Sequence, residues 1–375
     1  MSTPSPFASA DAINPQQFLQ ARGASLLAWG VKRVALREAA PQLERFDGEQ
    51  AGSWATVWRS LSKRAEARGD QLGAALNLGV ARLSLMGTPS EVAILAEQRR
   101  CFIAALSSFA TPVEQRVISI GGSEATAATP VYYYPAKANP PAALILLSGG
   151  LDTYKVELHQ MAVKLARATG YAIATVDMPG TGETPVPLTL DAHQWYRAML
   201  DALPAAGTKG VIGVSFAGYW AAKLALTHQV DFAVDLGGPV DARNRAKARL
   251  DEEPPEMRFL IERLIASGRT FATTSLALLE GMSMGRHGDL DVQSVAPLLV
   301  LNGCDDPYVD REDTTVFRNF AGAKVVLLAR SGHCSVERPG MLGTLLASWL
   351  LDRVSRPRIG GLATRAVFAT AARLA

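Results

Sequence analysis

Three side chains that together could carry out nucleophilic catalysis each follow a strand-like segment of the chain. Ser215 follows "GVIGV", Asp306 follows "PLLVLNG" within "CDDPYVD", and His333 follows "AKVVLLA" within "RSGHCS". Residues after parallel strands gather at the carboxyl edge of a sheet. There a histidine could take the serine proton as general base, while a carboxylate fixes the imidazole tautomer. This chemistry would attack a carbonyl group and form an acyl-enzyme.

The motif around Ser215 is typical of a sharp turn from a strand into a helix. Such a turn needs small residues two positions before and two positions after the serine, and glycine is usual at both. Gly213 and Ala217 hold these positions in "GVSFAG". Taken alone, the motif leaves open that Ser215 is only a small polar residue at the turn. The chain order serine, aspartate, histidine favours a nucleophile.

The carboxylate has two candidates. Asp306 is preferred because Asp306 and Pro307 together fix a turn, and apolar residues that follow anchor the loop. Asp305 is the fallback, and its alternative role is to cap the same loop. His333 has the alternative of being a surface loop histidine.

Backbone N–H groups are expected to stabilise an oxyanion beside Ser215. One donor is Phe216, the residue after the serine, and the second comes from Gly149, Gly150 or Leu151, after the segment "ALILLS". An ordinary strand-to-helix turn is the alternative for these glycines. Asp241, in "LGGPVDAR", is a weaker pocket candidate as an extra acid or base, and a helix N-cap or a solvated loop residue is the favoured interpretation.

The elements that must position these residues lie in two parts of the chain. Before Thr111 the apolar periodicity is helical, as in "SWATVWRSLSKRAEARGD", where Trp54 and Trp58 share one stripe and are expected to pack in the core. After Thr111 short apolar runs alternate with helical segments, a pattern typical of a mostly parallel sheet with helices on both faces. We therefore predict an α/β protein with these parts: a helical N-terminal domain at 1–110, a catalytic domain at 111–355 with a helical lid insertion at about 240–295, and a basic tail at 356–375.

Composition excludes several classes of protein. The chain has 375 residues, a net charge of +3 and no basic run interleaved with aromatic residues, so no nucleic-acid partner is expected. Three cysteines without C-x-x-C spacing argue against a disulfide framework and a zinc site, and no metal or cofactor is expected. The N-terminal sequence lacks the pattern of a signal peptide, and no apolar run is long enough to span a membrane. A cytoplasmic protein without a membrane partner is the expectation.

The motifs resemble those of α/β-hydrolases with a helical N-terminal domain. This group includes fermentation–respiration switch-type esterases, dihydroxypseudooxynicotine hydrolases and fungal hydrolases that shorten polyketide chains. The matching segments are "WATVWRSLSKRAEARGDQLGAALNLGVARL", "LLSGGLDTYKVE", "VDMPGTGET", "GVSFAGYWAAKLA", "LNGCDDPYV" and "SGHCS". The resemblance covers roughly 53–349; the chain departs from it at Ala217, and the basic tail has no counterpart.

The resemblance implies an α/β-hydrolase fold with Ser215 as nucleophile, Asp306 as acid and His333 as base. It also implies an oxyanion hole near Gly150 and Phe216, and a helical domain that covers the pocket and often mediates dimers, so a homodimer is expected. The implied activity is a serine hydrolase acting on a small to medium acyl substrate, with ester hydrolysis favoured. The alternatives are carbon–carbon hydrolysis of the retro-Claisen type, acyl transfer or cyclisation of a polyketide-like substrate, and a catalytically silent binding module.

Overall fold

The computed structural model describes residues 13–122, 125–204 and 206–354. Its helices are α1 (Pro15–Trp29), α2 (Arg33–Ala39), α3 (Trp54–Ala67), α4 (Gln71–Arg82), α5 (Pro89–Ala105), α6 (His159–Thr169), α7 (Ala192–Ala202), α8 (Gly218–Leu226), α9 (Ala246–Glu252), α10 (Pro255–Ala266), α11 (Ser275–Gly281), α12 (Met284–His287), α13 (Arg311–Thr315) and α14 (Pro339–Val354). Its strands are β1 (Glu114–Gly122), β2 (Ala125–Tyr134), β3 (Ala143–Ser148), β4 (Ala172–Val176), β5 (Thr208–Val214), β6 (Phe232–Leu236), β7 (Ser294–Gly303) and β8 (Ala321–Leu328). The predicted basic tail at 356–375 lies outside the described residues.

The strands of the described chain form one sheet in the order β1-β2-β4-β3-β5-β6-β7-β8. β1 and β2 pair antiparallel, β2 is also antiparallel to β4, and the remaining neighbours are parallel. β3, β4 and β6 are buried along their whole length, as expected for strands covered on both faces. The predicted mostly parallel sheet is therefore present, with its hairpin at one edge.

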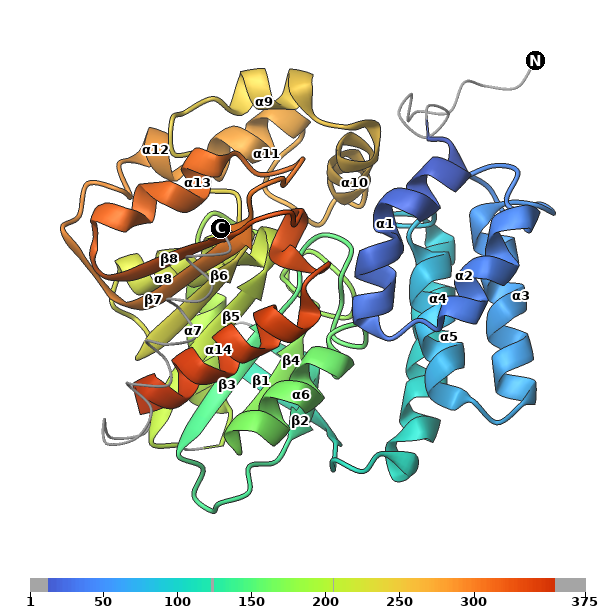
Figure 1. The fold of residues 1–375 in the computed structure, drawn as a ribbon, viewed down its shortest axis with the longest axis horizontal. Helices are drawn as coiled ribbons and strands as arrows, with labels where there is room; N and C mark the ends of the chain where they lie inside the picture. Colours follow the sequence, from blue (N-terminus) through green and yellow to red (C-terminus); the bar gives the residue numbers. More distant parts are fainter. Residues whose placement is uncertain (1–12, 123–124, 205, 355–375) are drawn as a thin grey trace.

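Helices cover both faces of this sheet. α6 and α14 contact each other on the face toward the viewer in Figure 1, and α7 and α8 pack behind it. α9 to α12 follow β6 and lie above the sheet in the same view, where the predicted insertion was expected. Because the loops after β5, β7 and β8 open toward this insertion, it covers the edge at which the chemistry-bearing residues meet.

The N-terminal helices α1 to α5 stand beside the sheet (Figure 1). The α3 helix begins where the Ser53 hydroxyl accepts the amide N–H of Thr56, and its apolar stripe is buried, with Trp54 and Trp58 inaccessible to solvent. Phe46 from this part packs edge-on against Phe259 of α10, with ring centroids 5.2 Å apart. The helical part and the sheet part thus share one hydrophobic core.

The α6 helix begins later than its sequence pattern predicts. Apolar spacing in "KVELHQMAVKLARATG" predicts a helix from Lys155, but α6 starts at His159. Polar contacts hold the preceding residues in a loop: the Lys155 amide donates to Asp177 (2.7 Å) and the Tyr154 amide donates to Glu157 (2.8 Å). Asp177 lies far from this segment in the sequence, and the Glu157 side chain competes with helical hydrogen bonds for a backbone amide. Apolar periodicity does not reveal either contact.

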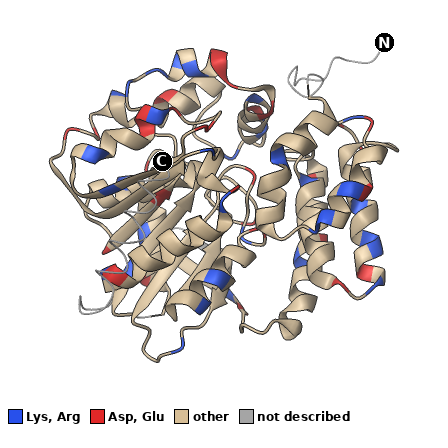
Figure 2. Cartoon of the chain, viewed as in Figure 1, with Lys and Arg blue, Asp and Glu red and all other residues tan. Residues whose placement is uncertain are grey.

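Lysine and arginine are interspersed with aspartate and glutamate over both parts of the molecule (Figure 2). This distribution agrees with the small net charge of +3. Within the described residues, none of the helices is both long and apolar enough to span a bilayer.

Candidate active site

Ser215 lies at the sharp turn between β5 and α8. Its φ of 56° is in the left-handed region, which is costly for a residue with a side chain and is often retained at functional sites. Gly213 is required before it, because a Cβ there would overlap the carbonyl oxygen of Ala217. Ala217 itself is buried at the second small position, so its methyl group fits the turn.

Ser215, His333 and Asp306 form a continuous hydrogen-bonded chain. The Ser215 hydroxyl lies 2.7 Å from Nε2 of His333, and Nδ1 of His333 lies 2.7 Å from Oδ2 of Asp306. With Nδ1–H donating to the carboxylate, Nε2 is left to accept the serine proton. The structure thus brings together the three residues predicted from the sequence.

The Asp306 carboxylate is held by several donors besides His333. The amides of Tyr308 (2.8 Å) and Val309 (3.3 Å) donate to Oδ1, and the Asn302 side chain donates to Oδ2 (2.7 Å). Burial raises the pKa of the Asp306 carboxyl, but the His333 ring and these donors outweigh burial, so the pKa is lowered overall. Asp306 is therefore an anion at neutral pH, whereas Asp305, its neighbour, is exposed.

His333 is half-buried against the same loop. Burial lowers the pKa of the His333 imidazole, but the adjacent Cys334 sulfur and the Asp306 carboxylate act in the opposite direction, and the net pKa lies above the ordinary value of 6.5. The Tyr308 ring packs edge-on against the imidazole, with ring centroids 5.3 Å apart. These contacts fix the ring plane between its two partners.

Gly150 lies directly beside the serine. A Cβ at Gly150 would be 2.9 Å from the amide nitrogen of Phe216 and 3.1 Å from Oγ of Ser215. Because residue 150 is a glycine, this space beside Ser215 stays open. Leu151 lines the same pocket, so the structure places all three predicted oxyanion residues, Phe216, Gly150 and Leu151, around the serine.

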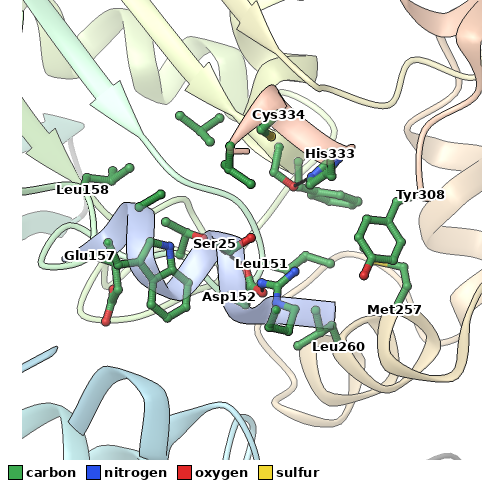
Figure 3. Close-up of a pocket in the computed structure, with 18 of the residues that line it drawn as sticks. Ser25, Leu151, Asp152, Glu157, Leu158, Met257, Leu260, Tyr308, His333 and Cys334 are labelled. Atoms are coloured by element: carbon green, nitrogen blue, oxygen red, sulfur yellow. Dashed lines mark hydrogen bonds and ion pairs between the residues drawn. The ribbon is translucent and has the colours of Figure 1, made fainter. Parts of the chain in front are cut away.

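The pocket above these residues lies between the two parts of the molecule (Figure 3). It has about 900 Å³ of empty space, which includes its opening to solvent. α1 supplies Trp29 and Arg22, and α10 of the insertion supplies Met257 and Leu260. Both the helical part and the insertion therefore form walls of the pocket that holds Ser215.

A family model described as the alpha/beta hydrolase family matches residues 144–342, more than half of the chain. The chain belongs to the α/β hydrolase family. The matched segment runs from within β3 through β8 and contains Ser215, Asp306 and His333. The family and fold predicted from the sequence are therefore confirmed.

Solved structures extend the likeness of this α/β hydrolase to its N-terminal helices. One described as wild-type AbyA5 is 18% identical, with a TM-score of 0.78 over 96% of this chain and 100% of that one. A 2,6-dihydroxy-pseudo-oxynicotine hydrolase is 23% identical, with a TM-score of 0.65 over 89% of this chain and 96% of that one. At these identities the likeness shows a shared fold. No curated protein matches the chain by sequence.

Asp241 lies apart from the pocket that holds Ser215. It lines a smaller cavity nearby, and its Oδ1 accepts the amide N–H of Arg245 at 2.5 Å. The Asp241 side chain is buried, and α9 has Arg245 at its N-cap with no side-chain cap, so neither role favoured from the sequence, a helix N-cap or a solvated loop residue, is found. Among the described side chains, no group of three or more His, Cys, Asp and Glu is arranged to hold a metal ion.

Arg22 and Tyr308 both line the pocket, and neither was predicted as a site residue from the sequence. Arg22 shares the buried stripe of α1 with Leu19 and Leu26, where only 6% of its surface is exposed. An arginine at an apolar position of a helix indicates a specific role, because burying a charge is costly unless the charge has a partner. This signal was present in the sequence. Tyr308 follows Asp306 closely in the sequence, but no spacing rule indicated that its ring would face His333.

Proposed function

We propose that this α/β hydrolase is a serine hydrolase in which Ser215, His333 and Asp306 form the catalytic triad. The observation that carries the proposal is the chain of two 2.7 Å contacts from the serine through the histidine to the carboxylate. The strained backbone at Ser215 and the open space beside Gly150 support it. A silent binding module would not require this combination.

The mechanism follows from this geometry. The Ser215 hydroxyl attacks a carbonyl carbon as His333 takes its proton, and the new oxyanion accepts N–H bonds from Phe216 and from Gly150 or Leu151. The imidazolium, stabilised by Asp306, then protonates the leaving group as its bond to the acyl carbon breaks. A water molecule, activated by the same histidine, releases the acid from the acyl-enzyme.

The pocket supports a small to medium acyl substrate. Most of its lining outside Ser215 and His333 is apolar, including Trp29, Met257 and Leu260, which suits an acyl chain. We propose ester hydrolysis as the principal activity, because an alkoxide leaving group needs only the proton that His333 carries.

Carbon–carbon bond hydrolysis is the second candidate, and one feature of the pocket favours it. The leaving group would then be an enolate. Its oxygen needs hydrogen-bond donors, because negative charge moves onto that oxygen as the carbon–carbon bond breaks. Arg22 and Tyr308 place a guanidinium and a phenol in the wall of the pocket. To serve the enolate, Arg22 would share its N–H groups with Asp152, and the Tyr308 hydroxyl would leave Glu256. Acyl transfer or cyclisation would use the same acyl-enzyme with an acceptor other than water.

A matched panel of substrates tests the proposal and separates its two chemistries. Each pair consists of an ester and the corresponding β-diketone with the same acyl group, assayed with wild-type protein and with Ser215→Ala. We expect wild-type turnover of short-chain esters and loss of turnover in the variant. Ester turnover that persists in Ser215→Ala would contradict the assignment, and preferential cleavage of the diketones would favour the second candidate.

A further inference from the structure

Arg82 is a buried cation that the mechanism does not use. It ends α4 in the helical part, and its side chain has 0% of its surface exposed. A guanidinium in such a place loses its hydration. Specific contacts within the protein must offset the free-energy cost of that loss. Its contacts therefore show what holds it there.

Most of these contacts are with the loop between β3 and α6, residues 149–158, which we call the oxyanion loop. Nη2 of Arg82 donates to the backbone carbonyl of Asp152 at 2.6 Å. The guanidinium lies 3.4 Å from the centroid of the Tyr154 ring, and Nη2 lies 3.9 Å from the Glu157 carboxylate. One side chain of the helical part thus touches three residues of the oxyanion loop.

Other residues of the helical part reinforce this attachment. The Gln98 side chain donates to Oε1 of Glu157 at 2.7 Å, and the Tyr154 hydroxyl donates to Glu91 at 2.9 Å. Arg22 pairs with the Asp152 side chain, while Arg82 holds the backbone carbonyl of the same residue. Asp152 is therefore fixed from two different helices.

The sheet part holds the opposite side of the oxyanion loop through Lys155. Its amide donates to Asp177 at 2.7 Å, and its ammonium group lies 2.6 Å from Asp177 and 2.8 Å from Glu183. The loop is consequently clamped between α4 and the turn after β4. Asp152 lies next to Leu151 and two residues from Gly150, whose backbone borders Ser215.

We propose that Arg82 is a positioning residue, which holds the oxyanion loop so that its backbone N–H groups face the oxygen that forms beside Ser215. The inference rests on the proposed function, because it assigns a role to Arg82 in the same reaction. It also gives the helical part a catalytic purpose beyond covering the pocket. The effect should appear in the transition state, because the oxyanion exists only there and in the tetrahedral intermediate.

Phosphonylation of Ser215 by a fluorophosphonate provides a direct test, since the reaction proceeds in one chemical step and its rate and binding constants can be separated. We compare wild type, Arg82→Met and Arg82→Lys. For Arg82→Met we expect the maximal inactivation rate to fall roughly tenfold or more, with the concentration for half-maximal rate changed less than about threefold. Arg82→Lys keeps the charge but not the planar fork, so its rate should lie between the two.

Leu61→Ala is the matched control, because it removes a buried core side chain of α3 without removing a contact to the oxyanion loop. Circular dichroism shows whether each variant is folded. Thermal melts measure how much stability each variant has lost, so that the rates are compared at similar losses. An inactivation rate that falls equally in Leu61→Ala and Arg82→Met at matched stability would overturn the inference. A change in Arg82→Met that affects only the fluorophosphonate concentration for half-maximal rate would also overturn the inference.

Binding of a trifluoromethyl ketone supplies a second measurement. This inhibitor adds to the serine and places an oxyanion in the site, so its affinity should weaken in Arg82→Met by a factor similar to the loss in rate. Unchanged affinity would contradict the inference even if the rate falls. If wild-type Ser215 reacts with neither probe, the proposed function fails and takes this inference with it, whereas a reactive wild type with an equally reactive Arg82→Met overturns the inference alone.

Discussion

At the scale of single residues, the sequence predicted the three residues that we propose as a triad, but not the neighbouring groups that orient them. Chain order and the strand-like segments before each residue were sufficient for Ser215 and His333. Asp306 was preferred to Asp305 because of its turn with Pro307, but both follow the same strand, and only the fold shows which side chain faces the histidine. Asn302 donates to the carboxylate from within a strand, where nothing in the sequence marks it.

Replacing the two neighbouring aspartates tests the carboxylate assignment. Asp306→Asn should lower kcat by roughly 10²- to 10⁴-fold, because an amide would not stabilise the imidazolium or its tautomer. Asp305→Asn is the matched control and should stay within about twofold of wild type, since Asp305 is exposed. Steady-state kinetics with a short ester measures both, and equal losses in the two variants would refute the choice of Asp306.

The pH dependence of activity tests the environment of His333. A general base must be unprotonated, and the pKa of His333 is raised above its ordinary value of 6.5. Protonation therefore persists to higher pH, so kcat/KM should rise with pH through a midpoint above 6.5. An acidic limb with its midpoint at or below 6.5 would show that the Asp306 carboxylate does not stabilise the imidazolium in the free enzyme.

At the scale of elements, periodicity located the strands and most helices but misplaced the start of α6. The segment from Lys155 to Leu158 has helical spacing. However, Asp177 accepts the amide N–H of Lys155, and Glu157 accepts that of Tyr154. Local pattern describes a segment in isolation, whereas the contact between Lys155 and Asp177 forms only when the turn after β4 meets this loop. The oxyanion loop was therefore the least predictable element near the site.

Gly150→Ala tests the space beside Ser215. The added methyl group would lie 2.9 Å from the Phe216 amide nitrogen, in the space where we propose that the substrate oxygen binds. We expect kcat to fall by roughly 10²-fold or more, comparable with the loss of an oxyanion donor, while the protein remains folded. Gly340→Ala serves as the control, because a Cβ there meets no atom within 4 Å. Near wild-type kcat in Gly150→Ala would show that the oxyanion forms elsewhere.

At the scale of the whole molecule, two parts with different patterns form one core. The change from helical periodicity to alternating strands was visible near Thr111, but the sequence did not show how the parts contact each other. Phe46 against Phe259, and Arg22 beside Asp152, join residues more than a hundred positions apart. Such contacts follow from tertiary packing, and a single sequence carries no record of them.

Deletion of residues 1–110 tests this shared core. Removing α1 to α5 would expose apolar surface on α10 and leave the oxyanion loop without Arg82 and Gln98. We expect the remaining chain to aggregate or to lack a cooperative thermal transition. The measurements are soluble yield and circular dichroism melts beside the full chain. A cooperatively folded fragment that still hydrolyses esters would contradict both the shared core and the role of the clamp.

The measurement that most directly tests the account is labelling of the full chain with a fluorophosphonate, followed by intact mass and peptide mapping. The account predicts one adduct per chain, located on Ser215 in wild-type protein and absent from folded Ser215→Ala and His333→Ala. Such a result would establish a serine activated by its histidine. An unlabelled but folded wild type, or an adduct on another residue, would contradict the assignment of Ser215 as the nucleophile.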